Sequence, residues 1–283
     1  GSSAETSNTI TINASENATA NVTISDVNIN TSDAAVFTKG KGNVNIELDG
    51  TNTLKSSNWH AGLEKNNDGK LTITDKNENG KLIATGSRYG AGIGGGNQRN
   101  GSNITITGGE ITAIGGYSGA GIGRGNYKDG NDINIAGGKV TATGGDYGAG
   151  IGGGDHGEGK NITITDGEVT AAGGTNGAGI GGGLRKEGEK ITVSGDATLK
   201  VQGGSGDGWD GAGAGIGNGG NHNGEFSGSF IPVNAAETEP DTSNLTTGKI
   251  EYYAPGADMT KDEPTSTILG SGQPTSPGET GAP

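Results

Sequence analysis

The sequence predicts an all-β fold: a single-stranded, right-handed parallel β-helix of about seven coils of about 29 residues, each with three short strands. Three observations lead to this prediction. Glycine accounts for 62 of 283 residues, and a glycine-rich motif recurs along the chain. Apolar residues alternate with Thr and Asn, as in strands with one buried face. All seven prolines lie at or after Pro232, so the preceding residues can donate their backbone N–H groups to a ladder.

The repeat sets the coil length. The string Gly-Ala-Gly-Ile-Gly begins at Gly90, Gly119, Gly148, Gly177 and Gly213, with spacings of 29, 29, 29 and 36 residues. Degenerate copies extend it towards the N-terminus, because Ala61-Gly62-Leu63 aligns with Ala91-Gly92-Ile93 and Ala34-Ala35-Val36 lies 27 residues earlier. No amphipathic segment of helical period is present, which excludes a helical solenoid.

Each repeat supplies three faces. The first carries the motif itself, with pairs such as Ala91/Ile93, and the second carries alternating pairs such as Ile104/Ile106. The third carries pairs such as Ile111/Ala113. Stacked coils lie roughly 4.8 Å apart, so seven make a rod on the order of 34 Å long. The core is then narrow, which explains a hydrophobic content of only 28%.

One column of charges tests the register. The residue that opens the third-face strand is Lys81, Glu110, Lys139 and Glu168 in successive coils. Alternating charges on adjacent strands predict a salt-bridge ladder with a structural role.

Composition divides the chain into four parts. Residues 1–6 are predicted to be a leader remnant, in which Gly1-Ser2-Ser3 is typical of a cloning scar, and 7–232 the β-helix, with the clearest repeats over 81–220. Residues 233–259 are predicted to cap the C-terminal edge, with a strand over 248–253. A Pro/Thr-rich linker to another domain is predicted over 260–283.

Bulk properties exclude several functions. There is no apolar run of about 18 residues, which argues against membrane insertion. The absence of cysteine excludes disulfides and thiolate chemistry. A net charge of −13 disfavours nucleic acid and anionic lipid as partners.

Motifs for cofactors are weak. The Gly-x-Gly-x-x-Gly pattern that starts at Gly90 lacks the strand–turn–helix context of a dinucleotide site, so these glycines are interpreted as tight corners. Carboxylates on glycine-rich loops make Ca²⁺ the one candidate ion, without a predicted position. They are Asp68, Asp129, Asp155 with Glu158, and Asp207 with Asp210.

No catalytic residue is predicted. The histidines His60, His156 and His222 are out of repeat register with one another. Charged side chains on neighbouring loops nevertheless keep a β-helix polysaccharide lyase or glycoside hydrolase as an alternative. They are Arg124, Lys128, Asp155, His156 and Arg185.

Aromatic residues gather at one corner, just before the first-face motif. Five of the eleven in the chain lie there, namely Trp59, Tyr89, Tyr117, Tyr147 and Trp209. Flat rings on the edge of a rod are suited to stacking on sugar faces. The alternative is an aromatic ladder that stabilises the coil stack.

The string Gly-Ala-Gly-Ile-Gly-Gly-Gly followed by Asn-Ile-Thr-Ile-Thr and Gly-Gly-Glu resembles secreted or wall-attached β-helix repeat proteins of Gram-positive anaerobic bacteria, often labelled carbohydrate-binding. The resemblance implies an extracellular location, attachment to a larger surface protein, and polysaccharide or host glycan as partner. It implies no catalytic residue. We therefore expect a non-catalytic module that binds carbohydrate or a host surface, with the enzyme and a purely structural stalk as alternatives.

Overall fold

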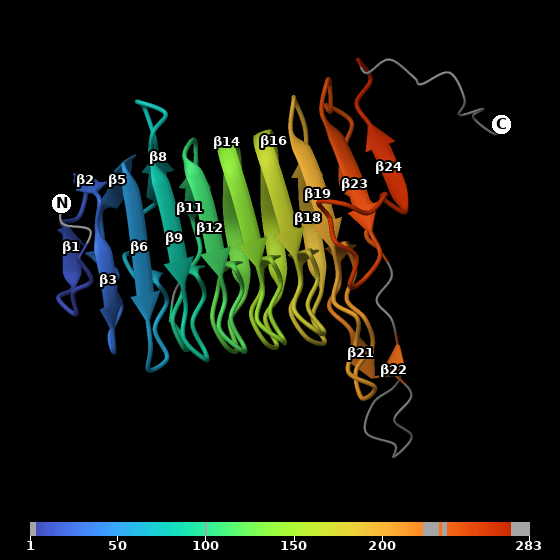
Figure 1. The fold of residues 1–283 in the computed structure, drawn as a ribbon, viewed down its shortest axis with the longest axis horizontal. Coiled ribbons are helices and arrows are strands. Elements are labelled where there is room, and N and C mark those ends of the chain that lie inside the picture. The colour runs from blue at the N-terminus through green and yellow to red at the C-terminus, as the bar shows by residue number, and fades with distance from the viewer. Residues whose placement is uncertain (1–3, 100, 223–231, 234–236, 273–283) are drawn as a thin grey trace.

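The computed structural model describes residues 4–99, 101–222, 232–233 and 237–272, which stack into an elongated solenoid (Figure 1). The described residues form 24 strands and no helix. They therefore contain no helix that is long and apolar enough to cross a membrane. Most neighbouring strands run parallel, each beside the strand one coil away. Ile93, for example, pairs with Ile122, so the motif spacing is the length of one coil. The parallel β-helix predicted from the sequence is confirmed.

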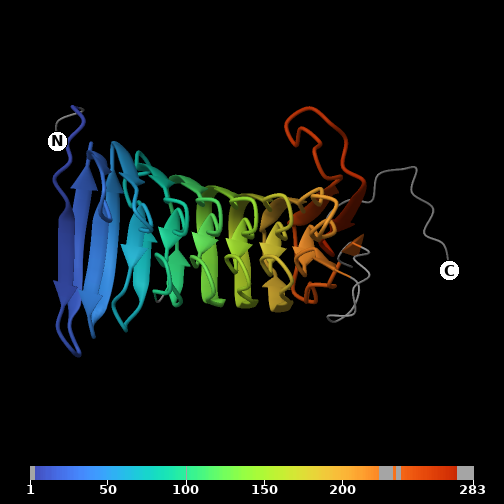
Figure 2. The same cartoon turned by 90° about the horizontal axis from the view of Figure 1, so that it is seen from below.

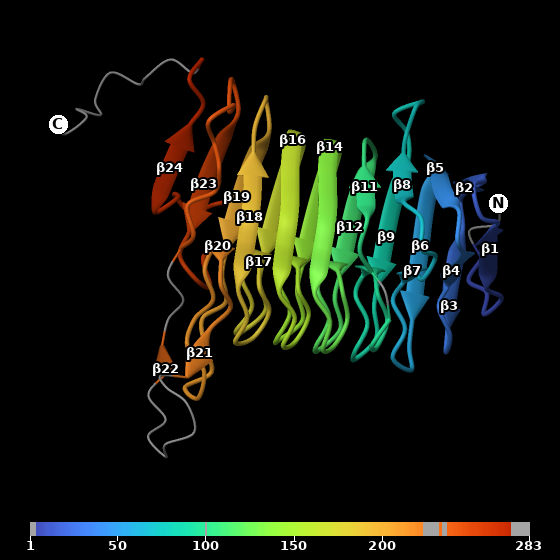
Figure 3. The same cartoon turned by 180° about the vertical axis from the view of Figure 1, so that it is seen from behind.

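Each coil has three faces, which Figures 1 and 3 show from opposite sides. Face 1 is an eight-stranded sheet, and faces 2 and 3 belong to one 14-stranded sheet. Face 1 consists of β1 (Ile10–Ala14), β4 (Val36–Gly40), β7 (Leu63–Lys65), β10 (Ile93–Gly94), β13 (Ile122–Gly123), β15 (Ile151–Gly152), β17 (Ile180–Gly181) and β20 (Ile216–Gly217). Face 2 consists of β2 (Thr19–Ser25), β5 (Asn43–Asp49), β8 (Leu71–Thr74), β11 (Ile104–Ile106), the first parts of β14 (Gly130–Thr143) and β16 (Gly159–Ala172), and β18 (Gly188–Val193). Face 3 consists of β3 (Asn28–Thr31), β6 (Thr51–Ser56), β9 (Lys81–Thr85), β12 (Glu110–Ile114), the second parts of β14 and β16, β19 (Thr198–Gln202) and β23 (Lys249–Tyr253).

The fifth and sixth coils differ from the predicted pattern of three separate strands. There, faces 2 and 3 are formed by the continuous strands β14 and β16. Their pairing shifts register between Ile135 and Lys139, where Gly137 and Gly138 have φ angles of 149° and 88°. The two glycines bend the chain between faces while it remains one strand.

The core consists of columns of identical or similar side chains. Ile93, Ile122, Ile151 and Ile180 of face 1 are fully buried, and each pairs in register with the next. Fully burying such a side chain contributes about 1.5–3 kcal/mol. Stacking thus lets a small number of apolar residues form a continuous core.

A column of glycines beside these isoleucines fixes the approach of the coils. Gly94, Gly123, Gly152 and Gly181 have φ angles between 131° and 136°. A Cβ atom at Gly123 would lie 2.1 Å from the carbonyl oxygen of Gly152. Only glycine fits both the backbone conformation and the space.

The predicted charge column is confirmed in its register. Glu110 pairs with Lys81 on one side and Lys139 on the other. Ion pairs join Lys81 Nζ to Glu110 Oε2 at 2.7 Å and Lys139 Nζ to Glu168 Oε2 at 3.8 Å. The hydrogen bond from Lys81 lowers the pKa of Glu110. Each exposed ion pair of this kind contributes little to the free energy of unfolding. The alternating charges instead favour the correct register between neighbouring strands.

The C-terminal end of the solenoid is covered by the chain that follows it. The strand predicted over 248–253 forms β23, which lies parallel to β19. Before it, Asp241 exchanges backbone hydrogen bonds with Ile191 and Val193 of face 2. The Glu237 carboxylate accepts backbone N–H groups at the end of face 1.

Two predicted boundaries differ in the structure. Thr6, assigned from sequence to the remnant, bridges to Ile29 and so extends face 3. β24 (Ser266–Leu269), within the predicted linker, pairs antiparallel with β23, because the strand on which it folds back offers a free edge. Gly1–Ser3 and residues 273–283, to which the remnant and linker predictions also apply, lie outside the described residues. The short antiparallel pair β21 (Asn221–His222) and β22 (Pro232–Val233) completes the strands.

Candidate functional site

The candidate site is the edge along which the chain passes from face 3 through face 1 to face 2, at the bottom of Figure 1 and towards the viewer in Figure 2. From β10 onward, each face 1 strand contains only two residues. The corner before it and the loop after it therefore lie side by side. The Asn97 N–H donates to the Trp59 carbonyl at 2.8 Å, and the Asp155 N–H to the Ser118 carbonyl at 2.8 Å. Each loop thus packs against the corner of the preceding coil.

The corners carry one aromatic residue in each of four successive coils, which we call the corner row: Trp59, Tyr89, Tyr117 and Tyr147. The three tyrosines form a connected group. Tyr117 and Tyr147 meet edge to face, with ring centroids 4.9 Å apart and hydroxyls 2.9 Å apart. Arg88 lies over the rings of Tyr89 and Tyr117, at 5.2 and 5.9 Å from their centroids. The hydrogen bond with Tyr117 raises the pKa of Tyr147 to about 12.

The two tryptophans are the more exposed members of the predicted set. Trp59 is 59% exposed and Trp209 is 63% exposed. Trp59 has a left-handed backbone, with φ at 78°. Trp209 lies in the insertion before the last motif, where its backbone N–H donates to Asp207 Oδ1. The structure therefore brings the tyrosines together and leaves both indoles open to solvent.

A second row of side chains lies on the same edge; the sequence analysis named its members His156 and Arg185 as loop charges but missed Gln98, Tyr127 and the row itself. The loops after face 1 present Gln98, Tyr127, His156 and Arg185 at a constant spacing of 29 residues, and we call these the loop row. Tyr127 is 59% exposed, and its ring stacks on His156 at 5.3 Å and 25°. The constant spacing of 29 residues could have revealed this row in the sequence. It is hard to notice because the four side chains are of different chemical types.

Charged groups on these loops are mostly engaged with one another. Asp155 is nearly buried, and its Oδ1 lies 2.5 Å from His156 Nδ1 while its Oδ2 accepts from Ser118 Oγ at 3.3 Å. Arg185 donates from Nε and Nη2 to the two oxygens of Asp210, at 2.8 and 3.1 Å. That bond raises the pKa of Arg185.

The charged set that motivated the enzyme alternative is divided in the structure. Arg124 is half-buried and bonds Ser102 at 2.6 Å, whereas Lys128 is exposed. His60 directly follows Trp59 and lies 2.8 Å from the fully buried Glu64. His222 lies 3.4 Å from Asp210, so the three histidines are in separate networks.

Most of the carboxylates considered for Ca²⁺ have protein partners. Asp129 accepts the Glu158 N–H at 3.1 Å, and Asp207 accepts two N–H groups of its own turn. Within the described ranges, no three His, Asp or Glu residues gather in a group that could hold a metal ion.

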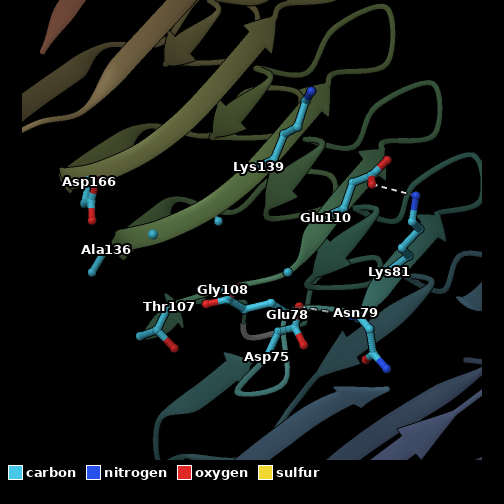
Figure 4. A pocket seen from close by; sticks show the side chains of 14 residues that line it. Asp75, Glu78, Asn79, Lys81, Thr107, Gly108, Glu110, Ala136, Lys139 and Asp166 are labelled. Carbon is cyan, nitrogen blue, oxygen red and sulfur yellow. Dashed lines mark hydrogen bonds and ion pairs between the residues drawn. The ribbon is translucent and has the colours of Figure 1, made fainter. Parts of the chain in front are cut away.

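A shallow groove of about 450 Å³ lies on the opposite side, where face 2 turns into face 3 (Figure 4). Its lining contains five glycines and charged residues that include Asp75, Lys81, Glu110 and Lys139. Lys81 and Glu110 are paired with each other in Figure 4. The groove thus coincides with the charge column, which already has a structural role.

Comparison with known proteins supports the fold and no finer statement. The model of the beta helix repeat matches residues 78–97, 104–123, 133–155 and 162–184. No curated protein and no solved structure matches the chain. The matched segments and the parallel coils together support a β-helix repeat protein.

Proposed function

We propose that this β-helix repeat protein is a non-catalytic, extracellular carbohydrate-binding module that holds a polysaccharide or host glycan along the edge described above. The observation that carries the proposal is the corner row, with one aromatic ring per coil over four successive coils. Adjacent coils are about 4.8 Å apart, so the row covers about 14 Å along the axis. Tyr and Trp combine an apolar ring with a polar group, which suits them to sugar rings.

The proposed location follows from the resemblance described from the sequence. Repeats of this kind are associated with secreted or wall-attached bacterial proteins. We propose that the module is part of a multidomain surface protein.

Affinity electrophoresis tests the proposal. Wild type runs in gels that contain hydroxyethyl cellulose, arabinoxylan, galactomannan, polygalacturonate or mucin glycans. At least one polymer should retard the wild type, and the triple variant Trp59→Ala/Tyr89→Ala/Tyr147→Ala should run as in an empty gel. Ile83→Ala is the control, because Ile83 is 39% exposed on face 3, away from the edge. Equal retardation of the triple variant would contradict the proposal, and release of reducing or unsaturated ends would favour the enzyme alternative.

A structural stalk is the second candidate, and the Tyr117–Tyr147 contact favours it. Edge-to-face rings on adjacent coils are what a stabilising ladder requires. On this alternative, no glycan retards the wild type, and the triple variant melts at a lower temperature.

A further inference from the structure

We infer that the loop row, Gln98, Tyr127, His156 and Arg185, is a second line of contacts to a polyhydroxylated chain that lies parallel to the solenoid axis. The inference rests on the proposed carbohydrate binding. It adds residues that determine specificity and the direction in which the ligand runs.

The backbone of the loop row is the first evidence. All four residues have left-handed φ angles, of 55°, 56°, 56° and 59°. Residues with a Cβ atom rarely adopt this conformation, and glycine relieves it. This chain places glycine at 62 positions, yet it keeps Gln, Tyr, His and Arg here. Retained strain of this kind points to a use for the side chains.

A second left-handed column provides the comparison. Asn103, Asp132, Asn161 and Lys190 have φ angles between 53° and 63°, again 29 residues apart. Three of these four are Asn or Asp, the types that tolerate the left-handed region. Of the loop row only His156 is a type enriched in this region, so the choice of Gln, Tyr and Arg does not follow from backbone geometry.

Two of the loop-row side chains are held by buried carboxylates, and each of the four still presents a surface to solvent. Gln98 is exposed, and Tyr127 packs only its ring face on His156. Asp155 holds Nδ1 of that imidazole, which leaves Nε2 without a hydrogen-bond partner among the described residues. Arg185 is oriented by both oxygens of Asp210. Donors and one aromatic face are therefore presented outward in fixed positions.

The two rows complement each other. The loop of Tyr127 is tied to the corner of Tyr89 by the Asn126 N–H bond of 3.1 Å. The loop of Arg185 is tied to Tyr147 by the Leu184 N–H bond of 2.9 Å. Aromatic rings thus line one side of the strip, and the other side carries amide, imidazole and guanidinium groups together with the ring of Tyr127. A sugar chain offers the matching surfaces, because its ring faces are apolar and its rim carries hydroxyls.

Glycine substitution separates binding from folding at these positions. The double variant Gln98→Gly/Tyr127→Gly relieves left-handed strain, so its melting temperature should equal or exceed that of the wild type. Its affinity for the polymer that most retards the wild type, among the five above, should fall about tenfold or more. Lys190→Gly is the matched control, with the same backbone change and no expected loss of affinity.

The melting temperature and the affinity together distinguish the possible outcomes. If the wild type is retarded and the double variant binds within twofold of it, the inference is overturned while the proposed function stands. A lower melting temperature together with lost binding would make the row structural and also overturn the inference. If none of the five polymers retards the wild type, the proposed function and the inference fall together.

Discussion

Replacement of Gly123 by alanine tests whether backbone crowding between coils, more than side-chain packing, sets the architecture. Gly123 lies in the middle of the glycine column of face 1, with φ at 136°. Its neighbours in the column, Gly94 and Gly152, approach it from both sides. The three atoms nearest to an added methyl group all belong to the Gly152 backbone.

The expected cost can be worked from the contacts. The added Cβ atom would lie 2.1 Å from the Gly152 carbonyl oxygen and 3.0 Å from its carbon. Relief requires a displacement of about 1 Å within a coil spacing of about 4.8 Å. The backbone conformation costs an alanine about 1–3 kcal/mol, and overpacking costs about 1–3 kcal/mol more. Gly123→Ala should therefore lower the free energy of unfolding by about 4 kcal/mol.

Thermal and urea unfolding, followed by circular dichroism, measure this loss. A change of that size corresponds to a fall of about 12 °C in melting temperature. Gly208→Ala is the control, because Gly208 also has a left-handed φ of 86° but no atom within 4 Å of the added methyl group. Its cost should be about 1 kcal/mol. Equal losses for the two variants would refute the reasoning, since inter-coil contact would then contribute nothing.

Two further predictions concern titratable groups. Lys65 is fully buried, and desolvation, with the nearby Arg124 charge second, lowers its pKa to about 8 from an ordinary 10.5. Between these two pKa values the unfolded chain binds more protons than the native protein, so the free energy of unfolding rises with pH. In urea unfolding, the wild type should gain about 2 kcal/mol over Lys65→Met from about pH 7 to 9.5. Parallel plots of unfolding free energy against pH for the two proteins would contradict this. Tyr117→Phe removes the hydrogen bond that raises the Tyr147 pKa to about 12. The Tyr147 pKa should then fall towards 10, as measured by titration of phenolate absorbance. An unchanged Tyr147 pKa would mean that burial, and not this hydrogen bond, raises it.

Much of the fold could be predicted because the repeat encodes strand pairing directly. Aligning the motifs placed Ile93 beside Ile122, and it placed Leu63 beside Val36 despite their degenerate sequence. The charge column was predictable for the same reason. β24 was not, because it depends on an edge that exists only after β23 has docked.

The candidate edge was predicted only in half. Three members of the corner row, Trp59, Tyr89 and Tyr147, lie two residues before the Ala of their motif, and Tyr117 lies three residues before it, so an alignment of the motifs makes the row visible. Tyr127 follows the motif and belongs to a segment of variable composition. Tyr127 lies near Tyr89 because β10 and β13 are only two residues long. Such short strands cannot be recognised from the alternation of apolar and polar residues.

The last motif spacing shows what this architecture leaves free to change. Ile216 still pairs with Ile180, although the spacing between their motifs is 36 residues and not 29. The additional residues, which include Trp209, project from the edge without disturbing the ladder. Loops on this edge can therefore be lengthened or replaced by evolution or engineering while the coils remain a constant frame, so new recognition surfaces need no redesign of the core.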